Sequence, residues 1–219
     1  MKVAPLAQLA FIVLAATSVY MFVSTAHDAE TRKACVPLCA MHPSYAGRNR
    51  TVPDFELPDL DGRSVRLSRY RGKTIVLSFW TSTCQPCLDE MPSLAELAGV
   101  LDQRRDVVLL TVSTDAEPAA IQRTLWSTLR APPPFEVLVD PQAAVVGGKF
   151  GTHLFPETWV IDPHGIIRAR FDGARDWASA LVLDLVDSIA QPFGCDVEFQ
   201  AGAPDAWSEE ICEDTGSSG

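Results

Sequence analysis

The stretch 74-TIVLSFWTSTCQPCLDEMP-92 joins a strand-forming run to a helical pattern through two cysteines. Residues 74–80 favour β-structure throughout, which is typical of a central strand buried on both faces. From Cys84 onward, apolar residues recur at three- and four-residue spacing and predict an amphipathic helix that begins at or just after Cys84. We therefore expect the cysteines to lie where a buried strand ends and a helix begins.

The spacing of Cys84 and Cys87 at a helix start favours thiol chemistry. The first N–H groups of a helix have no intrahelical acceptors and the macrodipole is positive there, so a thiolate at Cys84 is stabilised. Cys87 follows one turn later and can attack a mixed disulfide that Cys84 forms with a substrate. A structural zinc site needs two further ligands at similar spacing, and the sequence contains no second CxxC and no HxxxH. We predict that Cys84 is the nucleophile, that Cys87 is the resolving thiol, and that the site holds no metal and no other cofactor.

The remaining pattern predicts an α/β architecture. Residues 53–67 alternate apolar and polar residues around Asp61-Gly62, which favours a hairpin. Further along, the pattern predicts strands at 107–113 and 135–140, a late hairpin at 155–172, and helices at 117–130, 143–150 and 176–190. The order β-β-β-α-β-α-β-α-β-β-α favours a sandwich with parallel strands early, an antiparallel hairpin late and helices on both faces.

Two motifs resemble one protein superfamily. Residues 79–94, FWTSTCQPCLDEMPSL, and residues 155–167, FPETWVIDPHGII, are similar to the thioredoxin superfamily, and within it to membrane-anchored disulfide reductases of the TlpA/ResA type. The resemblance covers residues 53–190. It implies a thioredoxin-like three-layer sandwich, in which a central mixed β-sheet carries helices on both faces and an N-terminal hairpin extension. It also implies a cis peptide bond between Phe155 and Pro156.

The resemblance assigns further residues to the site. Pro156 is expected to lie against the two cysteines, and Phe155 is expected to present its backbone to an extended substrate strand beside Cys84. Trp80 is expected to flank the substrate groove. Glu157 directly follows Pro156, and it is either an acid near the cysteines, which makes it a candidate proton acceptor, or a solvated strand residue.

Three positions depart from the resembled pattern. Ser78 stands where thioredoxin has a buried acid, so that proton acceptor for Cys87 is missing. Thr83 replaces a common tryptophan before the first cysteine, and Gln85 replaces a glutamate or proline between the cysteines. These departures leave the redox potential and the proton path open, while the thiol exchange itself is retained.

The N-terminus predicts export. No residue from Val3 to Ala26 is charged, and this run is long enough to cross the hydrocarbon core of a bilayer, which takes about 20 helical residues. Residues 1–26 are therefore a membrane anchor or a signal peptide, and the length of the run favours an uncleaved anchor. With Lys2 in the cytoplasm, the rest of the chain is expected to be periplasmic or otherwise extracytoplasmic, tethered to the inner membrane.

The charge distribution excludes one class of partner and marks the C-terminus. A net charge of −10 argues against nucleic acid binding, which needs clustered Lys and Arg. Residues 195–219 contain seven acids and no Lys or Arg. We expect four segments, which are the anchor or signal at 1–26, a linker at 27–52, the thioredoxin-like domain at 53–190 and an acidic extension at 191–219.

Cys35 and Cys39, in the predicted linker, leave several alternatives open. Export permits a local disulfide, and a surface thiol pair fits the same spacing. On a helix, Cys35, Cys39 and His42 would share one face, and together with Met41 they offer ligands suited to Cu(I). This supports an alternative function, a copper-binding chaperone resembling the SCO type, although SCO-type proteins carry CxxxC rather than CxxC at the active position.

Two further alternatives concern the pairing of the C-terminal cysteines and the function of the protein. Cys195 and Cys212 most simply form a disulfide that closes the acidic tail. A peroxiredoxin-like peroxidase would share the fold. Its motif P-x3-T-x2-C is matched by Thr81 and Cys84, but Leu77 occupies the position of the proline.

The favoured function is a thiol-disulfide oxidoreductase that acts outside the cytoplasm. The resemblance favours reduction over oxidation, with protein thiols and disulfides as substrates. A reductase in that compartment needs a membrane electron donor, so we expect such a donor as a partner, together with the membrane itself through residues 1–26.

Overall fold

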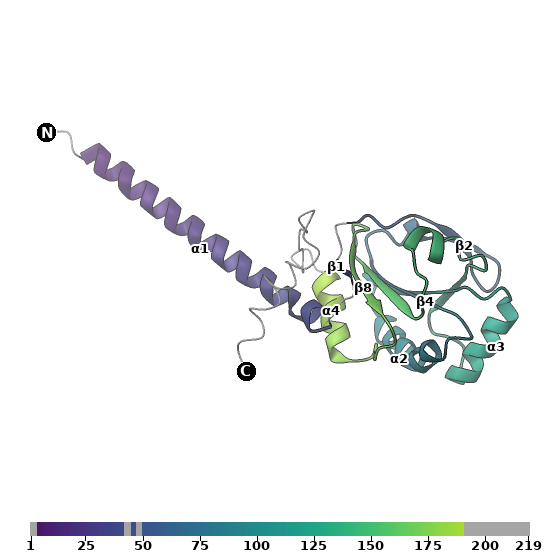
Figure 1. Cartoon of the computed structure of the whole chain (residues 1–219). Coiled ribbons are helices and arrows are strands. Elements are labelled where there is room, and N and C mark those ends of the chain that lie inside the picture. Colours follow the sequence, from purple (N-terminus) through teal and green to yellow (C-terminus); the bar gives the residue numbers. More distant parts are fainter. Residues whose placement is uncertain (1–3, 42–44, 47–49, 191–219) are drawn as a thin grey trace.

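The computed structural model describes residues 4–41, 45–46 and 50–190 of the 219-residue chain. The predicted disulfide between Cys195 and Cys212 therefore lies outside the described residues, as do His42 and the predicted acidic extension. Figure 1 shows a long N-terminal helix that leads into a domain of sheet and helices.

The described helices and strands follow the predicted order from β2 onward. The helices are α1 (Ala4–Met41), α2 (Gln85–Leu101), α3 (Pro118–Leu129) and α4 (Ala180–Ala190). The strands are β1 (Tyr45–Ala46), β2 (Glu56–Pro58), β3 (Ser64–Arg66), β4 (Thr74–Trp80), β5 (Val107–Ser113), β6 (Glu136–Val139), β7 (Glu157–Ile161) and β8 (Ile167–Asp172). Two short helical segments complete the set, η1 (Leu67–Tyr70) and the π-helical η2 (Val146–Phe150). The helix predicted at 143–150 is thus shorter than expected.

Every residue of β4 is buried, which places this strand at the centre of a mixed sheet. The strand order is β1-β8-β7-β4-β5-β6. Strands β4, β5 and β6 are parallel, whereas β7 and β8 form an antiparallel hairpin on the other side of β4. Because parallel neighbours need a crossover connection, α2 returns the chain from the end of β4 to the start of β5. The predicted arrangement of parallel strands early and an antiparallel hairpin late is confirmed.

Alternate residues of β4 point into two separate cores. Val76 and Trp80 belong to the helix-side core, in which α2, α3, α4 and the end of α1 pack on one face of the sheet. Ile75, Leu77 and Phe79 belong to the hairpin-side core, where β2, β3, η1 and η2 cover the other face. The structure thus has three layers with helical elements on both faces, as predicted. Among the described residues, the helical elements on the hairpin side are the short segments η1 and η2.

The N-terminal hairpin turns where the sequence predicts it. The Asp59 carboxylate accepts hydrogen bonds from the backbone N–H groups of Asp61 and Arg63, at 2.9 and 2.8 Å. Gly62 lies between them with φ = +80°, a left-handed conformation that glycine adopts without a steric penalty. The turn therefore closes β2 onto β3 and directs Val65 into the hairpin-side core.

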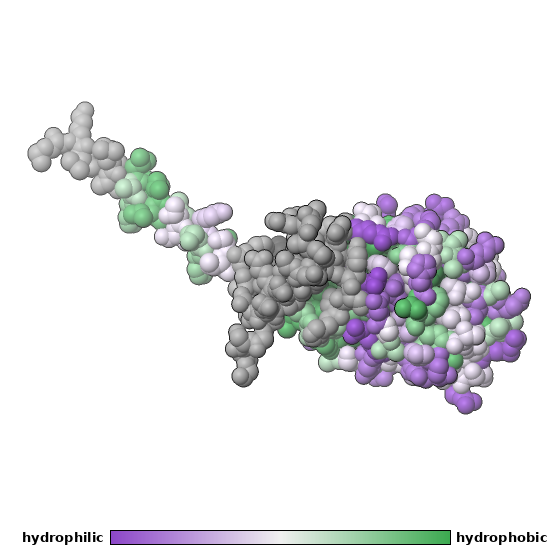
Figure 2. All heavy atoms as spheres, in the orientation of Figure 1, coloured by the Kyte–Doolittle hydropathy of each residue, from purple (hydrophilic) through white to green (hydrophobic). Residues whose placement is uncertain are grey.

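Helix α1 continues beyond the segment that resembles a membrane span. Its residues Gln8–Ala26 are long and apolar enough to cross a membrane, with a mean hydropathy of 2.0, and they stand clear of the domain (Figure 2). The linker expected at 27–52 is instead helical as far as Met41. Tertiary packing explains the difference, because Leu38 and Met41 lie in the helix-side core and their burial stabilises the helix. The local sequence pattern, which Pro37 interrupts, does not predict a helix here.

The end of α1 docks on the domain through α4. Cys35 and Leu38 share the helix-side core with Leu185 of α4. Arg175, in the loop before α4, donates a hydrogen bond from Nη1 to the carbonyl oxygen of Met41 at 3.0 Å. The last turns of α1 are therefore part of the folded domain as well as its connection to the predicted membrane span.

Replacing Leu38 by alanine tests this docking. Leu38 is 3% exposed, and removing its buried methyl groups leaves a cavity. We expect Leu38→Ala to lower the free energy of unfolding by about 2–4 kcal/mol, measured by urea denaturation of the full-length protein in detergent with tryptophan fluorescence. Val36 is 41% exposed on the same turn, so Val36→Ala should change stability by less than about 0.5 kcal/mol. Equal stability of Leu38→Ala and the wild type would contradict the docking.

Candidate active site

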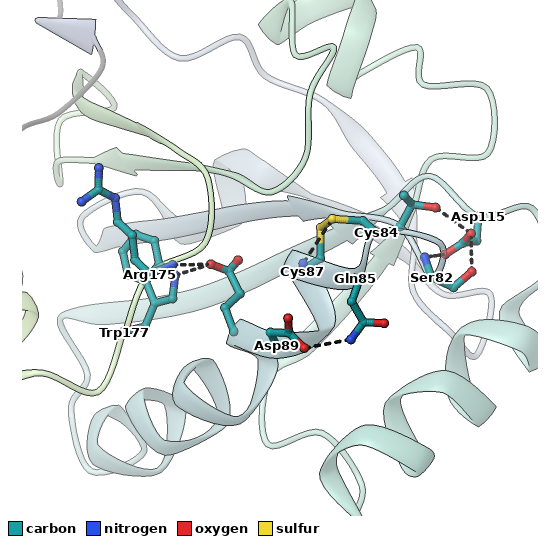
Figure 3. Close-up of a disulfide and its surroundings, with 10 residues drawn as sticks. Ser82, Cys84, Gln85, Cys87, Asp89, Asp115, Arg175 and Trp177 are labelled. Carbon is teal, nitrogen blue, oxygen red and sulfur yellow. Dashed lines mark hydrogen bonds between the residues drawn. A yellow bond between two sulfur atoms is a disulfide. The ribbon is translucent and has the colours of Figure 1, made fainter.

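Cys84 and Cys87 lie at the N-terminus of α2 and form a disulfide (Figure 3). Cys84 is the N-cap residue, with an extended backbone at φ = −88° and ψ = 97°. Its sulfur accepts a hydrogen bond from the backbone N–H of Cys87 at 3.2 Å. Pro86 occupies the first turn, where no N–H donor is needed. The first cysteine therefore lies against the N–H groups that α2 leaves unsatisfied, where a thiolate is stabilised.

The two sulfur-bearing residues differ in exposure. Cys87 is fully buried in the helix-side core, whereas Cys84 is partly exposed. A substrate disulfide can reach Cys84 in this arrangement and cannot reach Cys87. The difference in exposure supports the two different roles that the sequence pattern predicts.

Asp115 holds the turn that precedes Cys84. Its carboxylate accepts hydrogen bonds from Thr81 Oγ1 at 2.8 Å, from the N–H and Oγ of Ser82 at 2.7 and 2.8 Å, and from Ser113 Oγ at 2.8 Å. Burial raises the pKa of Asp115, but the hydroxyl and N–H donors outweigh burial and hold this pKa below its usual value. The ionised carboxylate therefore ties the end of β5 to the turn before α2 (Figure 3).

The peptide bond between Phe155 and Pro156 is cis, as the resemblance implies. Strand β7 begins at the next residue and pairs antiparallel with β4, so that Glu157 lies opposite Phe79. This register brings Pro156 level with the end of β4, beside the turn that leads to Cys84. Pro156 is buried and Phe155 is partly buried. The fold thus brings the proline of the second motif to the cysteine end of the sheet.

Glu90 is a buried carboxyl group that the sequence analysis did not single out. It follows Cys87 by one turn on α2 and is 3% exposed. Its Oε2 accepts hydrogen bonds from Trp177 Nε1 at 3.0 Å and from the backbone N–H of Arg175 at 3.1 Å. Burial raises the pKa of Glu90 to about 7, against the lowering effect of these two residues. A carboxyl group with this pKa can exchange a proton near neutral pH, one turn from the second cysteine.

The sequence carries one signal that identifies Glu90. The residue falls beside Met91 on the face of α2 that is otherwise buried and apolar, where an acid is unusual. Ser78, at the position of the buried acid of thioredoxin, lies inside β4, and its hydroxyl has no hydrogen-bond partner in the part of the chain that the structure describes. The buried acid near the cysteines is therefore Glu90 on α2, whereas β4 has Ser78 at the position where thioredoxin has its buried acid.

Glu157 does not join the cysteines. It is buried at the start of β7, where it accepts hydrogen bonds from Trp159 Nε1 at 2.8 Å and from Thr152 Oγ1, and it lies 3.7 Å from Arg170 Nε. Burial raises its pKa, and these three partners oppose the shift. Because side chains alternate along a strand, Glu157 faces the hairpin-side core with Trp159, whereas Cys87 lies in the helix-side core. The sheet separates the two, so Glu157 is neither an acid beside the cysteines nor a solvated strand residue.

Trp80 does not flank an open groove. Its side chain is fully buried in the helix-side core at the end of β4. Within residues 50–190, its indole Nε1 has no hydrogen-bond partner. The alternation of β4 directs Trp80 to the same side as α2, so the structure gives no support for contact with a substrate. The exposed side chains near the second motif are instead His153 and Leu154, which precede Phe155.

The copper-site alternative at Cys35 and Cys39 does not fit the state of these residues. Both are disulfide-bonded, so their sulfurs are not available as thiolate ligands. In residues 4–41, 45–46 and 50–190, no group of three or more His, Cys, Asp or Glu side chains is arranged to hold a metal ion.

Comparisons with known proteins agree with the site geometry. The profile of the AhpC/TSA family matches residues 49–170, more than half of the chain. Thiol-disulfide oxidoreductase ResA of Geobacillus thermodenitrificans is 34% identical over 123 residues, which cover 56% of this chain and 68% of that protein. Thioredoxin-like protein YneN of Bacillus subtilis is 27% identical over 117 residues, covering 53% and 66%.

A solved structure shows the same fold. The Chlorobium tepidum protein described as a thiol:disulfide interchange protein DsbE matches with a TM-score of 0.56 at 24% identity, over 66% of this chain and 98% of that chain. The fold and the relatives define this protein as a thioredoxin-like thiol-disulfide oxidoreductase of the ResA/TlpA type. The chain belongs to the AhpC/TSA family, whose profile covers residues 49–170.

Replacing Glu90 by glutamine tests the cost of its buried charge. The pKa of about 7 exceeds the ordinary value of 4.5, so the folded protein binds this proton more tightly than the unfolded chain and loses stability as the pH rises between these values. The full penalty at pH 8 is on the order of 3 kcal/mol. Glu90→Gln keeps an acceptor for Trp177 and should remove this pH dependence, measured by urea denaturation at about pH 4.5 and about pH 8.

The exposed Asp89 offers a matched control on the same turn of α2. Asp89→Asn should retain the wild-type loss of stability between the two pH values, because it leaves the buried Glu90 carboxyl group in place. If Glu90→Gln lost as much stability as the wild type over this range, Glu90 would not be the buried group that titrates.

Proposed function

We propose that the protein is an extracytoplasmic disulfide reductase in which Cys84 is the nucleophile and Cys87 is the resolving thiol. The observation that carries this proposal is the asymmetry of the pair, since Cys84 is partly exposed at the N-cap of α2 while Cys87 is buried one turn later. The direction of reduction is supported by the resemblance of the two motifs to membrane-anchored disulfide reductases. ResA of Geobacillus thermodenitrificans carries the name thiol-disulfide oxidoreductase, which is compatible with either direction.

The reaction begins from the reduced protein. The Cys84 thiolate attacks one sulfur of a client disulfide, so an S–S bond forms between Cys84 and the client, and the other client sulfur leaves and takes up a proton. Cys87 then loses its proton and attacks Cys84 Sγ, which breaks the bond to the client and releases the second client thiol. Two electrons have passed to the client, and the protein is left with the Cys84–Cys87 disulfide seen in the structure.

Glu90 is proposed as the proton acceptor for Cys87. A fully buried thiol needs a base before it can attack, and Glu90 is a buried carboxyl group one turn further along the same helix. Hydrogen bonds from Trp177 and Arg175 orient Oε2, while Oε1 has no hydrogen-bond partner among the described residues. Oε1 is therefore the atom proposed to receive the proton, directly or through one water molecule.

Protein disulfides are the proposed substrates, bound beside Phe155. The preceding residue, Leu154, is 83% exposed, whereas Phe155 itself contacts both cores. An extended client segment that pairs with the Phe155 backbone would carry its disulfide past Cys84, because the register of β7 with β4 places Pro156 at the end of β4. The exposed residues His153 and Leu154, which precede the cis bond, support this direction of approach.

The proposed location is outside the cytoplasm, with α1 as an uncleaved anchor. The roughly 15 residues between Ala26 and Met41 span about 20 Å of helix, so the domain at residues 53–190 would be held near the membrane surface. A dithiol electron donor in the membrane would transfer two electrons to the Cys84–Cys87 disulfide and restore both thiols. The apolar surface of Gln8–Ala26 supports this placement.

Trapping of the mixed disulfide tests the roles of the two cysteines. Reduced Cys87→Ser should accumulate an adduct between Cys84 and a peptide that contains a disulfide, because the resolving thiol is missing. Reduced Cys84→Ser should form almost none, since Cys87 is buried. Mass spectrometry after alkylation measures both, and equal trapping by the two variants would contradict the assignment.

The reduction potential tests the direction. Equilibration of the full-length protein with glutathione and dithiothreitol buffers should give a potential well below about −200 mV, as expected for a reductase. A potential near −120 mV would indicate an oxidant and overturn the proposed direction. The Cys84→Ser and Cys87→Ser variants should show no such two-electron transition, which identifies the signal with this pair.

A further inference from the structure

Cys35 and Cys39, at the end of α1, are both disulfide-bonded. They are four residues apart on a helix, which separates their Cβ atoms by about 5–6 Å, whereas a disulfide needs about 3.5–4.5 Å. Within residues 4–41, 45–46 and 50–190, the one disulfide that joins two described cysteines is Cys84–Cys87. Cys35 and Cys39 are therefore not bonded to each other, and each has another cysteine as its partner.

We infer that Cys35 and Cys39 are cross-linked to Cys195 and Cys212 of the C-terminal segment. The chain has six cysteines, and the active-site pair is bonded to itself, so these two are the remaining partners within one molecule. Each helix cysteine takes one C-terminal cysteine. This pairing replaces both local pairings that sequence proximity favours.

The packing of α4 brings the C-terminal segment within reach. Ile189, in the last turn of α4, shares the helix-side core with Cys35. Cys195 follows Ala190 by five residues, a length that spans up to about 17 Å when extended. This reach is about three times the roughly 5–6 Å between the Cα atoms of a disulfide. Cys212 lies further along and has a longer reach, so both bonds can form while α1 stays packed on α4.

These bonds are structural and separate from the thiol exchange at the active site. Cys35 and Cys39 are 1% and 9% exposed, whereas Cys84 is partly exposed, so a dithiol reaches the active-site pair far more readily. Formation of each bond removes two electrons and two protons from two thiols and reduces a disulfide-bearing oxidant to a dithiol. The presence of such an oxidant depends on the extracytoplasmic location that we propose for the protein. The choice of partners rests on the helix geometry and the cysteine count.

Tryptic mapping of the full-length protein without reductant tests the pairing. Trypsin cleaves on both sides of residues 34–48, which contain Cys35 and Cys39, and it leaves residues 176–219 whole because no Lys or Arg follows Arg175. After alkylation of free thiols, we expect one species with the summed mass of the two peptides less the hydrogens lost in two disulfides. Reduction should split it. A second protease that cleaves after acidic residues should separate the two C-terminal cysteines and leave two C-terminal fragments, each linked to residues 34–48 by one disulfide.

The matched control is the Cys84→Ser/Cys87→Ser double variant, which should give the same linked species because the bonds do not involve the active-site pair. Separate peptides 34–48 and 176–219, with internal disulfides or alkylated cysteines, would overturn the inference. A disulfide-linked dimer on a gel without reductant would overturn it as well. The linked species together with an oxidant-like potential of the active-site pair would support the pairing and overturn only the proposed direction of catalysis.

Discussion

The N-terminus of α2, held at the end of a strand that is buried on both faces, is the constraint on which the rest of the site depends. Strand β4 is buried along its whole length, so its end cannot shift without exposing apolar surface to water. The helix that follows begins with N–H groups that lack intrahelical partners, and Cys84 is its N-cap. Asp115, two residues after β5, ties down the turn, while the register of β7 brings Pro156 to the same place. The geometry of the thiol-exchange site therefore depends on the order of the strands in the sheet, because three separate strand ends position its residues.

The buried carboxyl group of Glu90 connects the chemistry of the site to the packing of the domain. Its burial is unfavourable for the charged form, and N–H donors from Trp177 and Arg175 offset part of that cost. Arg175 also donates from its guanidinium to the carbonyl oxygen of Met41. One residue thus contacts both the acid near Cys87 and the end of α1, so the loop before α4 links the position of α1 to the environment of the acid.

The sequence predicted the parts of the fold and site in which local pattern and burial agree. The strand at 74–80 and the helix from Gln85 follow from residue periodicity, and the cysteine pair follows from its place between them. Glu90 and Asp115 were missed because their partners lie far away, with Trp177 87 positions from Glu90. Trp80 and Glu157 were assigned by adjacency to a motif, but alternation across the sheet directs their side chains away from the expected places.

The sequence by itself determined the cysteine pair, the strand-to-helix junction and the apolar segment near the N-terminus. Each of these depends on neighbours within one or two turns of chain, where propensity and spacing carry the information. Only the tertiary structure decided that α1 remains helical as far as Met41, that Glu90 is buried one turn from Cys87, and that Glu157 faces the hairpin side. Burial arises from contacts between segments that are distant in the chain, and a local pattern does not show which element will cover a given face.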